Sequence, residues 1–452
     1  MRRSLVVLGG TGDLTGRLLL PSLAHLAASG ALGEDVEVRA VSQEDWSDDE
    51  YRDWAHRRLA EHAQEVDAQA RERLIARLRY DHADVTDPRQ LRAALEGLGG
   101  VPIVYLALPN TVFHPTLQAL VEVGLPEGAQ VVVEKPFGRD RADAQALNDV
   151  LHRLVPEDAV FRIDHFLAMQ TVLNILGLRF ANRLFEPAWN AAHVERVEIV
   201  FDEALGLEGR AGYYDTAGAL RDMLQNHLLQ LLALVAMDPP HTLDASALPA
   251  RKADVLRAVS PPADMRAGSV RGRYTAGTVG GRELPAYVDE KGVDPDRDTE
   301  TYAEFTVTVD NWRWAGVPFR LRTGKALGTD RQEIAVHFKP VPHLPFGDEP
   351  PRPDVLRLRF DPDGIALELN LNGAGAPFDL ERQVLQVGLP RQELPAYGIL
   401  FRELLAGDTT LSISDVEAEE SWRVVEPVLA AWAAGEVPLL EYPAGSSGPA
   451  RA

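Results

Sequence analysis

The stretch that decides the fold is SLVVLGGTGDL, Ser4 to Leu14, in which an apolar run leads directly into closely spaced glycines. Arg17 to Ser29 then has apolar residues at helical spacing. Strand, glycine turn and helix in this order are typical of a dinucleotide-binding unit, because glycines let the backbone approach a pyrophosphate and the helix N-terminus offers N–H groups. The spacing is Gly-x-x-Gly rather than G-x-G-x-x-G, so an ordinary tight turn is the alternative.

The residues after the next strand predict which cofactor is bound. We expect this strand at Val36 to Val41, followed by Ser42-Gln43-Glu44-Asp45. At this point an acidic residue suits a free ribose hydroxyl and a basic residue suits a 2′-phosphate. The sequence therefore favours NAD slightly over NADP. The alternative is that Glu44 and Asp45 belong to the first turn of the following helix, where acidic residues are favourable.

Two further apolar runs predict parallel strands that are buried on both faces. They are Ile103 to Leu108 and Gln130 to Val133, and each ends in a polar turn, Pro109-Asn110 and Glu134 to Gly138 respectively. Ligands of open α/β sheets bind beyond the carboxyl ends of the strands. Lys135, one of only five lysines in the chain, is therefore expected where a substrate or nicotinamide would lie.

An Asp-His pair and a distant histidine are candidates for the chemistry. Asp164 and His165 lie in FRIDHFLAMQ, Phe161 to Gln170, and His227 lies on a long apolar helix predicted over Asp215 to Met237. If His227 meets Asp164, the carboxylate would fix the imidazole tautomer and make it a general base near neutral pH. The alternatives are a hydrogen-bonded loop for the pair and an ordinary core position for His227.

The second half of the chain predicts an antiparallel sheet. Alternation of apolar and polar residues marks Val194 to Phe201, Ile334 to Lys339, Val355 to Phe360 and Ile365 to Leu371. The fold class is therefore a Rossmann-like α/β dinucleotide-binding domain, residues 1–163, and an α+β domain with a large, mainly antiparallel sheet, residues 164–441. Residues 442–452, rich in Gly, Ser and Pro, are expected to form a flexible tail.

Composition limits the partners. The 452 residues suffice for two domains, and 46 basic against 68 acidic residues give a net charge of −22, which argues against nucleic acid or an anionic membrane as a partner. The chain has no Cys, and no apolar run approaches the length of a membrane span. We expect a cytoplasmic protein, and no cluster of metal ligands is visible.

Several longer motifs resemble the glucose-6-phosphate dehydrogenase family. They are GGTGDL from Gly9, EKPFG from Glu134, RIDHFL from Arg162, GYYDTAGALRDMLQNHLLQLLALVAM from Gly212, and DTETYAEFTVTVDNWRWAGVPFRLRTGKAL from Asp298. The resemblance covers nearly the whole chain in order. It implies oxidation of glucose 6-phosphate at C1 to 6-phosphogluconolactone, with hydride transfer to NAD or NADP, as in the oxidative pentose phosphate pathway. It also implies a homodimer.

The resemblance implies a role for each matching position. His227 would be the base and Asp164 the carboxylate that orients it. The implied sugar-phosphate contacts are Lys135, His165, Glu203, Asp222, Lys325 and Arg331. The implied cofactor contacts are Gly9, Thr11, Gly12, Asp13, Leu14, Gln43, Glu44, Pro109 and Lys135.

Two departures from the family pattern concern the anion sites. The family continues from the histidine with a Tyr and, three residues later, a Lys, whereas this chain has Phe166 and Met169. The NADP-selective Arg of the family corresponds to Gln43 or Glu44. One alternative hypothesis is therefore the same chemistry on a sugar without the 6-phosphate or with another 6-substituent. Another is a non-catalytic, nucleotide-binding paralogue.

Overall fold

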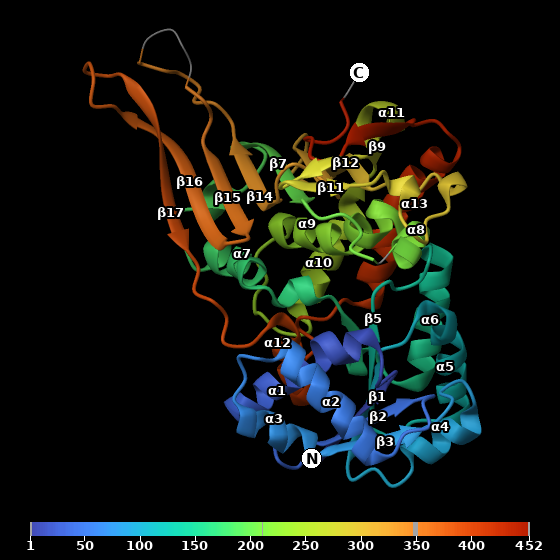
Figure 1. Cartoon of the computed structure of the whole chain (residues 1–452). Helices are drawn as coiled ribbons and strands as arrows, with labels where there is room; N and C mark the ends of the chain where they lie inside the picture. The colour runs from blue at the N-terminus through green and yellow to red at the C-terminus, as the bar shows by residue number, and fades with distance from the viewer. Residues whose placement is uncertain (1, 210, 347–350, 451–452) are drawn as a thin grey trace. The chain divides into compact units, whose positions relative to one another are not determined.

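The computed structural model describes residues 2–209, 211–346 and 351–450, which form two compact units (Figure 1). The first unit takes residues up to 169 together with 240–250 and 392–419, and the second takes 170–239, 251–391 and the residues from 420 onward. The sequence predicts a single boundary after residue 163, whereas the chain of the structure returns to the first unit twice.

The first unit is built on a six-stranded parallel sheet in the order β3-β2-β1-β4-β5-β6. The strands are β1 (Arg3–Leu8), β2 (Glu37–Ser42), β3 (Leu78–His82), β4 (Val101–Leu106), β5 (Gln130–Glu134) and β6 (Val160–Ile163). This is the strand order of the Rossmann fold, whose ligands bind where the order reverses, between β1 and β4. The predicted α/β fold of this half is thus confirmed.

Helices complete the first unit. They are η1 (Thr15–Leu19), α1 (Leu20–Ser29), α2 (Asp48–His62), α3 (Ala68–Ile75), α4 (Pro88–Leu95), α5 (Asn110–Val123), α6 (Arg141–Leu154), η2 (Glu157–Ala159), η3 (His165–Ala168) and α12 (Ala396–Ala406). Local sequence fixes their ends: Ser47 and Glu50 form a capping box at α2, and Gly30 takes φ +76° after α1. The late helix α12 buries Leu400 and Leu404 in the same core as α1.

Two strands of the first unit were not predicted. β3 follows α2 and α3, and its charged residues mask its strand character. β6 carries Arg162 in an otherwise apolar run. The Arg162 side chain is fully buried because Glu157 accepts its Nη1 proton at 2.7 Å and Asn148 Oδ1 accepts its Nη2 proton at 2.8 Å.

The second unit contains a large mixed sheet in the order β17-β16-β15-β14-β7-β13-β12-β9-β18, with β8 beside β12. The strands are β7 (Val194–Asp202), β8 (Val259–Ser260), β9 (Ser269–Thr275), β12 (Tyr302–Val309), β13 (Pro318–Gly324), β14 (Arg331–Phe338), β15 (Val355–Phe360), β16 (Asp363–Asn372), β17 (Leu380–Gly388) and β18 (Leu439–Pro443). Neighbours are antiparallel except β7 with β13 and β9 with β18. The predicted, mainly antiparallel sheet is confirmed, and β10 (Gly277–Val279) and β11 (Arg282–Leu284) form a separate hairpin.

Helices pack against the sheet of the second unit: α7 contacts β15 and β16, and α9 contacts α7 (Figure 1). The helical elements are α7 (Gln170–Phe180), η4 (Glu186–Ala188), α8 (Ala211–Ala219), η5 (Leu220–Leu228), α9 (Leu229–Ala236), α11 (Met265–Gly268), η6 (Tyr287–Asp289) and η7 (Pro295–Arg297). Two further helices, α10 (Ala247–Ala258) and α13 (Asp415–Ala433), contain residues of both units. Every residue of α9 is buried, which explains why its sequence is apolar except for Gln230, whose Oε1 atom accepts a hydrogen bond from Lys252 Nζ at 3.1 Å.

The helix predicted over Asp215 to Met237 is broken at Gly218. This residue takes φ +71°, and a Cβ atom there would lie 2.5 Å from Glu300 Oε1. The same carboxylate oxygen accepts the Leu220 N–H at 2.9 Å. An acidic group at a helix N-terminus is favourable, so Glu300 fixes the point at which the His227 helix restarts.

The predicted flexible tail is not found in the described residues. β18 pairs with β9 through residue 443, and Tyr442 is buried. Gly445 N–H donates to Ala326 O at 2.8 Å, and Gly328 N–H donates to Ser446 O at 2.8 Å. The small residues that resemble a linker are needed because backbone atoms approach closely: a Cβ atom on Gly445 would lie 2.1 Å from Thr278 O.

The helices within residues 2–209, 211–346 and 351–450 include no candidate for a membrane span. None of these helices combines the length and the apolar character that crossing a bilayer requires.

Candidate active site

The glycine turn after β1 is shaped by close backbone approach. Gly9 has φ +87°, and a Cβ atom there would lie 2.3 Å from Ala107 O. A Cβ atom on Gly10 would lie 2.4 Å from the Ala40 Cβ atom. Thr15 Oγ1 donates to Gly9 O at 3.0 Å and ties the turn to the start of η1. The turn therefore needs glycine, and it places a helix N-terminus at the switch point of the sheet, as a pyrophosphate requires.

The adenosine side of the predicted cofactor site lies beside this turn. Thr11 Oγ1 donates to Glu44 Oε2 at 2.8 Å, and the Thr11 N–H donates to Ser42 Oγ at 3.2 Å. Helix α2 begins only after its cap Ser47, so Glu44 is not part of its first turn. Gln43 and Glu44 are both exposed. The structure thus brings an acidic side chain to the glycine turn, where a ribose would bind.

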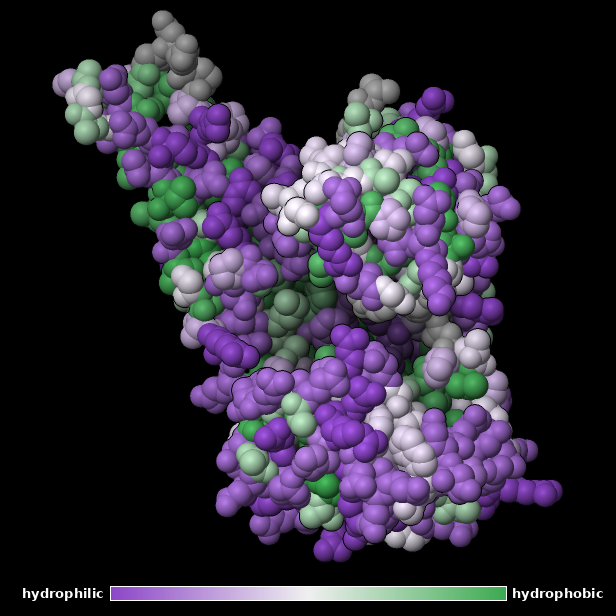
Figure 2. Space-filling view, viewed as in Figure 1, coloured by the Kyte–Doolittle hydropathy of each residue, from purple (hydrophilic) through white to green (hydrophobic). Residues whose placement is uncertain are grey.

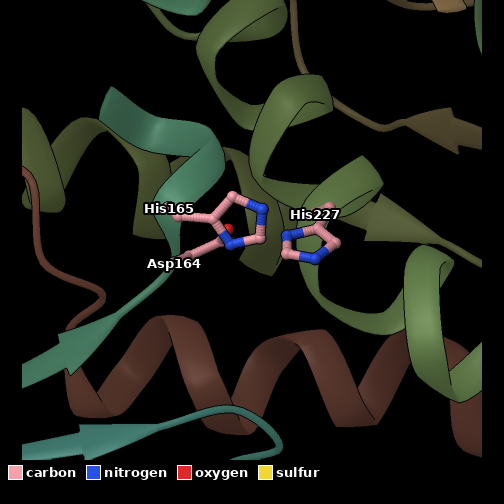
Figure 3. Close-up of side chains that lie close together, drawn as sticks. All are labelled: Asp164, His165 and His227. Carbon is pink, nitrogen blue, oxygen red and sulfur yellow. The ribbon is translucent and has the colours of Figure 1, made fainter. Parts of the chain in front are cut away.

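The carboxyl ends of β4, β5 and β6 carry the other candidates of the first unit. Pro109 caps α5 after β4, and Lys135 follows β5 directly. Asp164 follows β6; it is 1 % exposed, and its Oδ1 accepts the Phe166 N–H at 3.0 Å (Figure 3). His165 stacks on Tyr397 of α12 with ring centroids 5.7 Å apart. No local pattern points to Tyr397, because this residue joins the group from a segment more than 200 residues later in the chain.

His227 lies in the second unit on η5, a π-helical segment (Figure 3). It is 1 % exposed, and its backbone N–H donates to Asn226 Oδ1 at 2.6 Å. A π turn closes hydrogen bonds between residues five apart, and Asp222 and His227 are five apart, so the widened helix places them one turn from each other. π turns occur frequently at functional sites. Asp164 and His227 belong to different units, and their pairing stays a prediction.

Three predicted substrate residues gather in the second unit around Tyr214. Lys325 Nζ and Glu203 Oε2 form an ion pair, and Lys325 Nζ lies 6.0 Å from the Tyr214 ring centroid. Burial, followed by the charges of Asp222 and Glu300, raises the pKa of Tyr214 well above its usual value. Tyr214 is a site candidate that the sequence reading missed, although it directly precedes the Asp215 of the quoted motif.

Arg331 pairs in the strand register with Asp202, the residue before Glu203, and its side chain contacts the acidic residues of the second sheet. Its Nη2 atom is 3.2 Å from Glu198 Oε2 and 2.8 Å from Glu333 Oε1. These contacts continue across the strands as alternating ion pairs, through Arg320 on one side and Arg357 on the other. These ion pairs are structural, and the role of Arg331 toward the sugar phosphate stays a prediction.

Comparisons with protein families cover the two halves separately. Residues 6–174 match the family model described as the NAD binding domain of glucose-6-phosphate dehydrogenase. Residues 176–452 match the model of the C-terminal domain of the same enzyme. Together the two matches account for nearly the whole chain.

Relatives and solved structures agree with these matches. The glucose-6-phosphate 1-dehydrogenases of Zymomonas mobilis and Rhizobium meliloti are 37 % and 38 % identical, each over 99 % of this chain and over 96 % and 94 % of their own. A glucose-6-phosphate dehydrogenase structure in complex with glucose-6-phosphate is 30 % identical, with a TM-score of 0.88 over 99 % of this chain and 95 % of its own. The Mycobacterium avium enzyme gives 34 % identity and a TM-score of 0.86 over 99 % of this chain and 96 % of its own. The chain therefore belongs to the glucose-6-phosphate dehydrogenase family.

Proposed function

We propose that this protein is an NAD(P)-dependent glucose-6-phosphate 1-dehydrogenase. It converts glucose 6-phosphate and NAD(P)⁺ into 6-phosphogluconolactone, NAD(P)H and a proton. The observation that carries this function is the full-length similarity to a glucose-6-phosphate dehydrogenase whose structure was solved in complex with its substrate, glucose-6-phosphate. The reaction places the protein in carbohydrate metabolism, in a step of the pentose phosphate pathway type.

The described residues fit a nicotinamide dinucleotide. Three features match the requirements of a pyrophosphate. They are the glycine turn, which has no room for Cβ atoms, the helix N-terminus that follows the turn, and the strand order. When bound, the cofactor accepts a hydride from C1 of the sugar. Gly9, Thr11, Gly12, Asp13 and Leu14 would hold the pyrophosphate side, with Gln43 and Glu44 at the adenosine and Pro109 and Lys135 toward the nicotinamide.

The chain supplies the proton chemistry and the substrate contacts. His227 would take the proton of the C1 hydroxyl, and Asp164 would hold the imidazole in the required tautomer. The sugar phosphate would be bound by Lys135, His165, Glu203, Asp222 and Lys325. Arg331 is proposed as a further contact of the sugar phosphate. The burial of Asp164 and His227 supports these roles, because a buried imidazole is shielded from exchange with bulk water.

A spectrophotometric assay tests the function directly. Purified protein is given glucose 6-phosphate or free glucose, each with NAD and with NADP, and reduction of the cofactor is followed. Rapid reduction with glucose 6-phosphate is expected. Activity on free glucose alone would contradict the proposed substrate, and no activity with either sugar would leave a nucleotide-binding protein without this chemistry.

We further propose that NAD is accepted at least as well as NADP, and the Gln43→Arg variant tests this. The exposed Glu44 carboxylate beside Thr11 would repel a 2′-phosphate, whereas an arginine at residue 43 would pair with it. The variant is expected to raise the ratio of kcat/KM for NADP to that for NAD by about tenfold, equivalent to about 1.4 kcal/mol. Steady-state kinetics with both cofactors at fixed glucose 6-phosphate give the ratio.

The matched control is Gln43→Met, which has similar size and no charge. It should leave the cofactor ratio near that of the wild type. Adding Glu44→Gln to Gln43→Arg should move the ratio further toward NADP, because it removes the repulsion. An unchanged ratio in both arginine variants would show that the adenosine 2′ position lies elsewhere.

A homodimer through the outer strands of the second sheet is the oligomeric state that we propose. β17 is exposed along most of its length, and Leu385 and Val387 are 57 % and 56 % exposed. Figure 2 shows apolar surface along the strands that Figure 1 labels β16 and β17. An exposed, apolar edge strand normally requires a covering partner.

The Leu385→Asp/Val387→Asp variant is expected to be monomeric, because burying two carboxylates in an apolar interface is costly. Sedimentation velocity at micromolar protein concentration measures the change from the dimeric wild type. Trp312→Asp is the control, since Trp312 is fully exposed but lies outside the outer strands. A monomeric wild type, or a dimeric double variant, would contradict the proposed interface.

We also propose a cytoplasmic location, on composition alone. The chain has no Cys, so its stability depends on no disulfide, which suits a reducing compartment. Cell fractionation that recovers the activity with the cytoplasmic contents would support this location. Recovery with an exported fraction would contradict it.

A further inference from the structure

The second unit contains a cavity that has no role in the proposed chemistry. Its volume is about 260 Å³, and its wall includes Gly218 at the break before η5, Arg271 of β9 and Trp432 of α13. Pockets for drug-sized ligands measure roughly 300–1,000 Å³, so this cavity suits a smaller ligand. Its charged lining residues are Asp215, Arg221, Arg271, Arg297, Asp298 and Glu300.

One arginine of this lining is already paired. Arg297 Nη1 lies 2.8 Å from Asp215 Oδ2, and the Asp294 N–H donates to the same oxygen at 3.1 Å. Asp215 Oδ1 accepts a hydrogen bond from the Tyr287 hydroxyl at 2.7 Å. Both oxygens of Asp215 are thus occupied, so neither Asp215 nor Arg297 needs a ligand.

The guanidinium groups of Arg221 and Arg271 have few protein partners in the part of the chain that the structure describes. Arg271 donates from Nε to Val437 O at 2.9 Å, and no described residue accepts a hydrogen bond from its Nη atoms. The Arg221 guanidinium forms no hydrogen bond or ion pair with a described residue. Arg271 is only 9 % exposed, so bulk water solvates it poorly. A buried cation with unused N–H groups requires an acceptor, and an anion is the most favourable one.

The two remaining acidic residues offset this positive charge only in part. Neither Asp298 nor Glu300 forms a close ion pair with a described arginine. Glu300 Oε1 accepts the Leu220 N–H at 2.9 Å, and Asp298 is exposed to solvent. Burial lowers the pKa of the Arg271 guanidinium, although the charges of Glu300 and Asp298 act in the opposite direction. The desolvated positive charge of Arg271 is therefore not fully balanced.

We propose that this cavity binds a phosphate group between Arg221 and Arg271, either as free phosphate or as part of a small organic ester. A guanidinium group suits phosphate because it can donate two parallel hydrogen bonds to it. Arg221 lies in the first turn of η5, directly before Asp222. A phosphate held by Arg221 would therefore stabilise the start of the helical segment that carries His227. The binding goes beyond the proposed function and does not depend on it.

Calorimetric titration of the full-length protein with inorganic phosphate, in a buffer without other oxyanions, tests the site. Arg221→Met is expected to weaken phosphate binding by about tenfold or more, because it removes a charged hydrogen-bond donor and no contact that the fold needs. The exposed Arg266→Met makes the same change of charge outside the cavity and should bind phosphate like the wild type. Equal affinity of the wild type and Arg221→Met for phosphate would overturn the proposal.

The proposed substrate site could also bind phosphate, and three further variants separate the two sites. His165→Asn alters the substrate site and should leave the binding step of the cavity intact. Ala217→Glu adds a carboxylate to the cavity lining and should abolish that step, whereas Ala217→Gln, of nearly equal size, should keep it. Loss of all phosphate binding in His165→Asn, with normal binding in Ala217→Glu, would show that the cavity binds no phosphate.

Titrations with glycerol phosphate and with glycerol distinguish the two sources of the phosphate group. Tighter binding of glycerol phosphate than of inorganic phosphate would identify an organic ester as the ligand, and equal or weaker binding would identify free phosphate. Glycerol alone should not bind. Binding of glycerol that Arg221→Met leaves unchanged would contradict recognition through the phosphate.

Hydrogen exchange followed by mass spectrometry tests the effect on η5. The measurement is made in the His165→Asn background, so that phosphate in the substrate site does not contribute. Saturating phosphate should slow exchange in a peptide covering residues 220–228 by about threefold, and should not do so when Arg221→Met is added. Exchange requires no turnover, so a protein inactive on glucose 6-phosphate would still report on this site. Unchanged exchange in the presence of phosphate would refute the link between the cavity and η5.

Discussion

Replacing His227 with asparagine is expected to lower kcat for glucose 6-phosphate by about 10²-fold or more at neutral pH. Asparagine can keep hydrogen bonds but cannot take the C1 hydroxyl proton. Part of the rate should return as pH rises, because hydroxide ion can replace a missing base. Steady-state kinetics between pH 6 and pH 10, with the melting temperature measured alongside, give both results.

The control for His227→Asn is His337→Asn. His337 also lies in the second unit, with its Nε2 atom 3.6 Å from Glu198 Oε2 on the charged sheet face. Its replacement should change stability and leave kcat nearly unchanged. If His227→Asn retained the wild-type kcat, His227 would not be the base, and the π-helical segment would need another explanation.

The pairing of His227 with Asp164 can be tested by non-additivity. Residues that act as one catalytic unit lose little more when both are replaced than when one is. Asp164→Asn alone should lower kcat strongly, and the double variant Asp164→Asn/His227→Asn should be about as active as His227→Asn. Losses that multiply would show that the two side chains work independently.

Restoring the family's anion contacts with Phe166→Tyr/Met169→Lys is expected to lower KM for glucose 6-phosphate by about 10- to 100-fold. Each new hydrogen bond or ion pair to a phosphate contributes roughly 1–3 kcal/mol, and tenfold corresponds to about 1.4 kcal/mol. Both positions lie on or next to η3, directly after the Asp164-His165 pair. Initial rates over a range of glucose 6-phosphate concentrations provide the comparison.

The controls for this variant omit the added positive charge, raise the salt concentration, or replace the substrate by free glucose. Phe166→Tyr/Met169→Leu adds no cation, so it should recover only part of the gain. The gain should shrink at high salt, which screens an exposed ion pair, and KM for free glucose should not improve. An unchanged KM for glucose 6-phosphate would mean that other residues already hold its phosphate.

The fold could be predicted where sequence pattern and burial agree. Continuous apolar runs predict β1, β4 and β5, and closely spaced glycines predict the turn after β1. The alternation of apolar and polar residues predicts strands of the second sheet. β3 and β6 were missed because their charged residues are paired in three dimensions, as Arg162 is with Glu157. The flexible-tail prediction failed for a similar reason, since small residues that suit a linker also permit tight backbone packing at Gly445.

The candidate site was predictable only as separate motifs. The spacing of Asp222 and His227 does not reveal a π turn, and nothing near Lys325 in the sequence points to Tyr214. Tyr397 reaches His165 only because α12 returns to the first unit. Such contacts depend on the chain path, which a local pattern does not contain.

The interrupted path of the chain has a consequence for synthesis on the ribosome. Domains generally fold as they emerge, N-terminal part first, but here the first unit lacks its α12 segment until residues 392–419 have been made. The segment of Lys325 is completed later still. Its carbonyl group accepts a hydrogen bond at 2.8 Å from the hydroxyl of Tyr442, which is synthesised 117 residues later. A nascent chain therefore carries two incomplete cores for most of its translation, and a stalled or truncated product would be a substrate for chaperones and proteases.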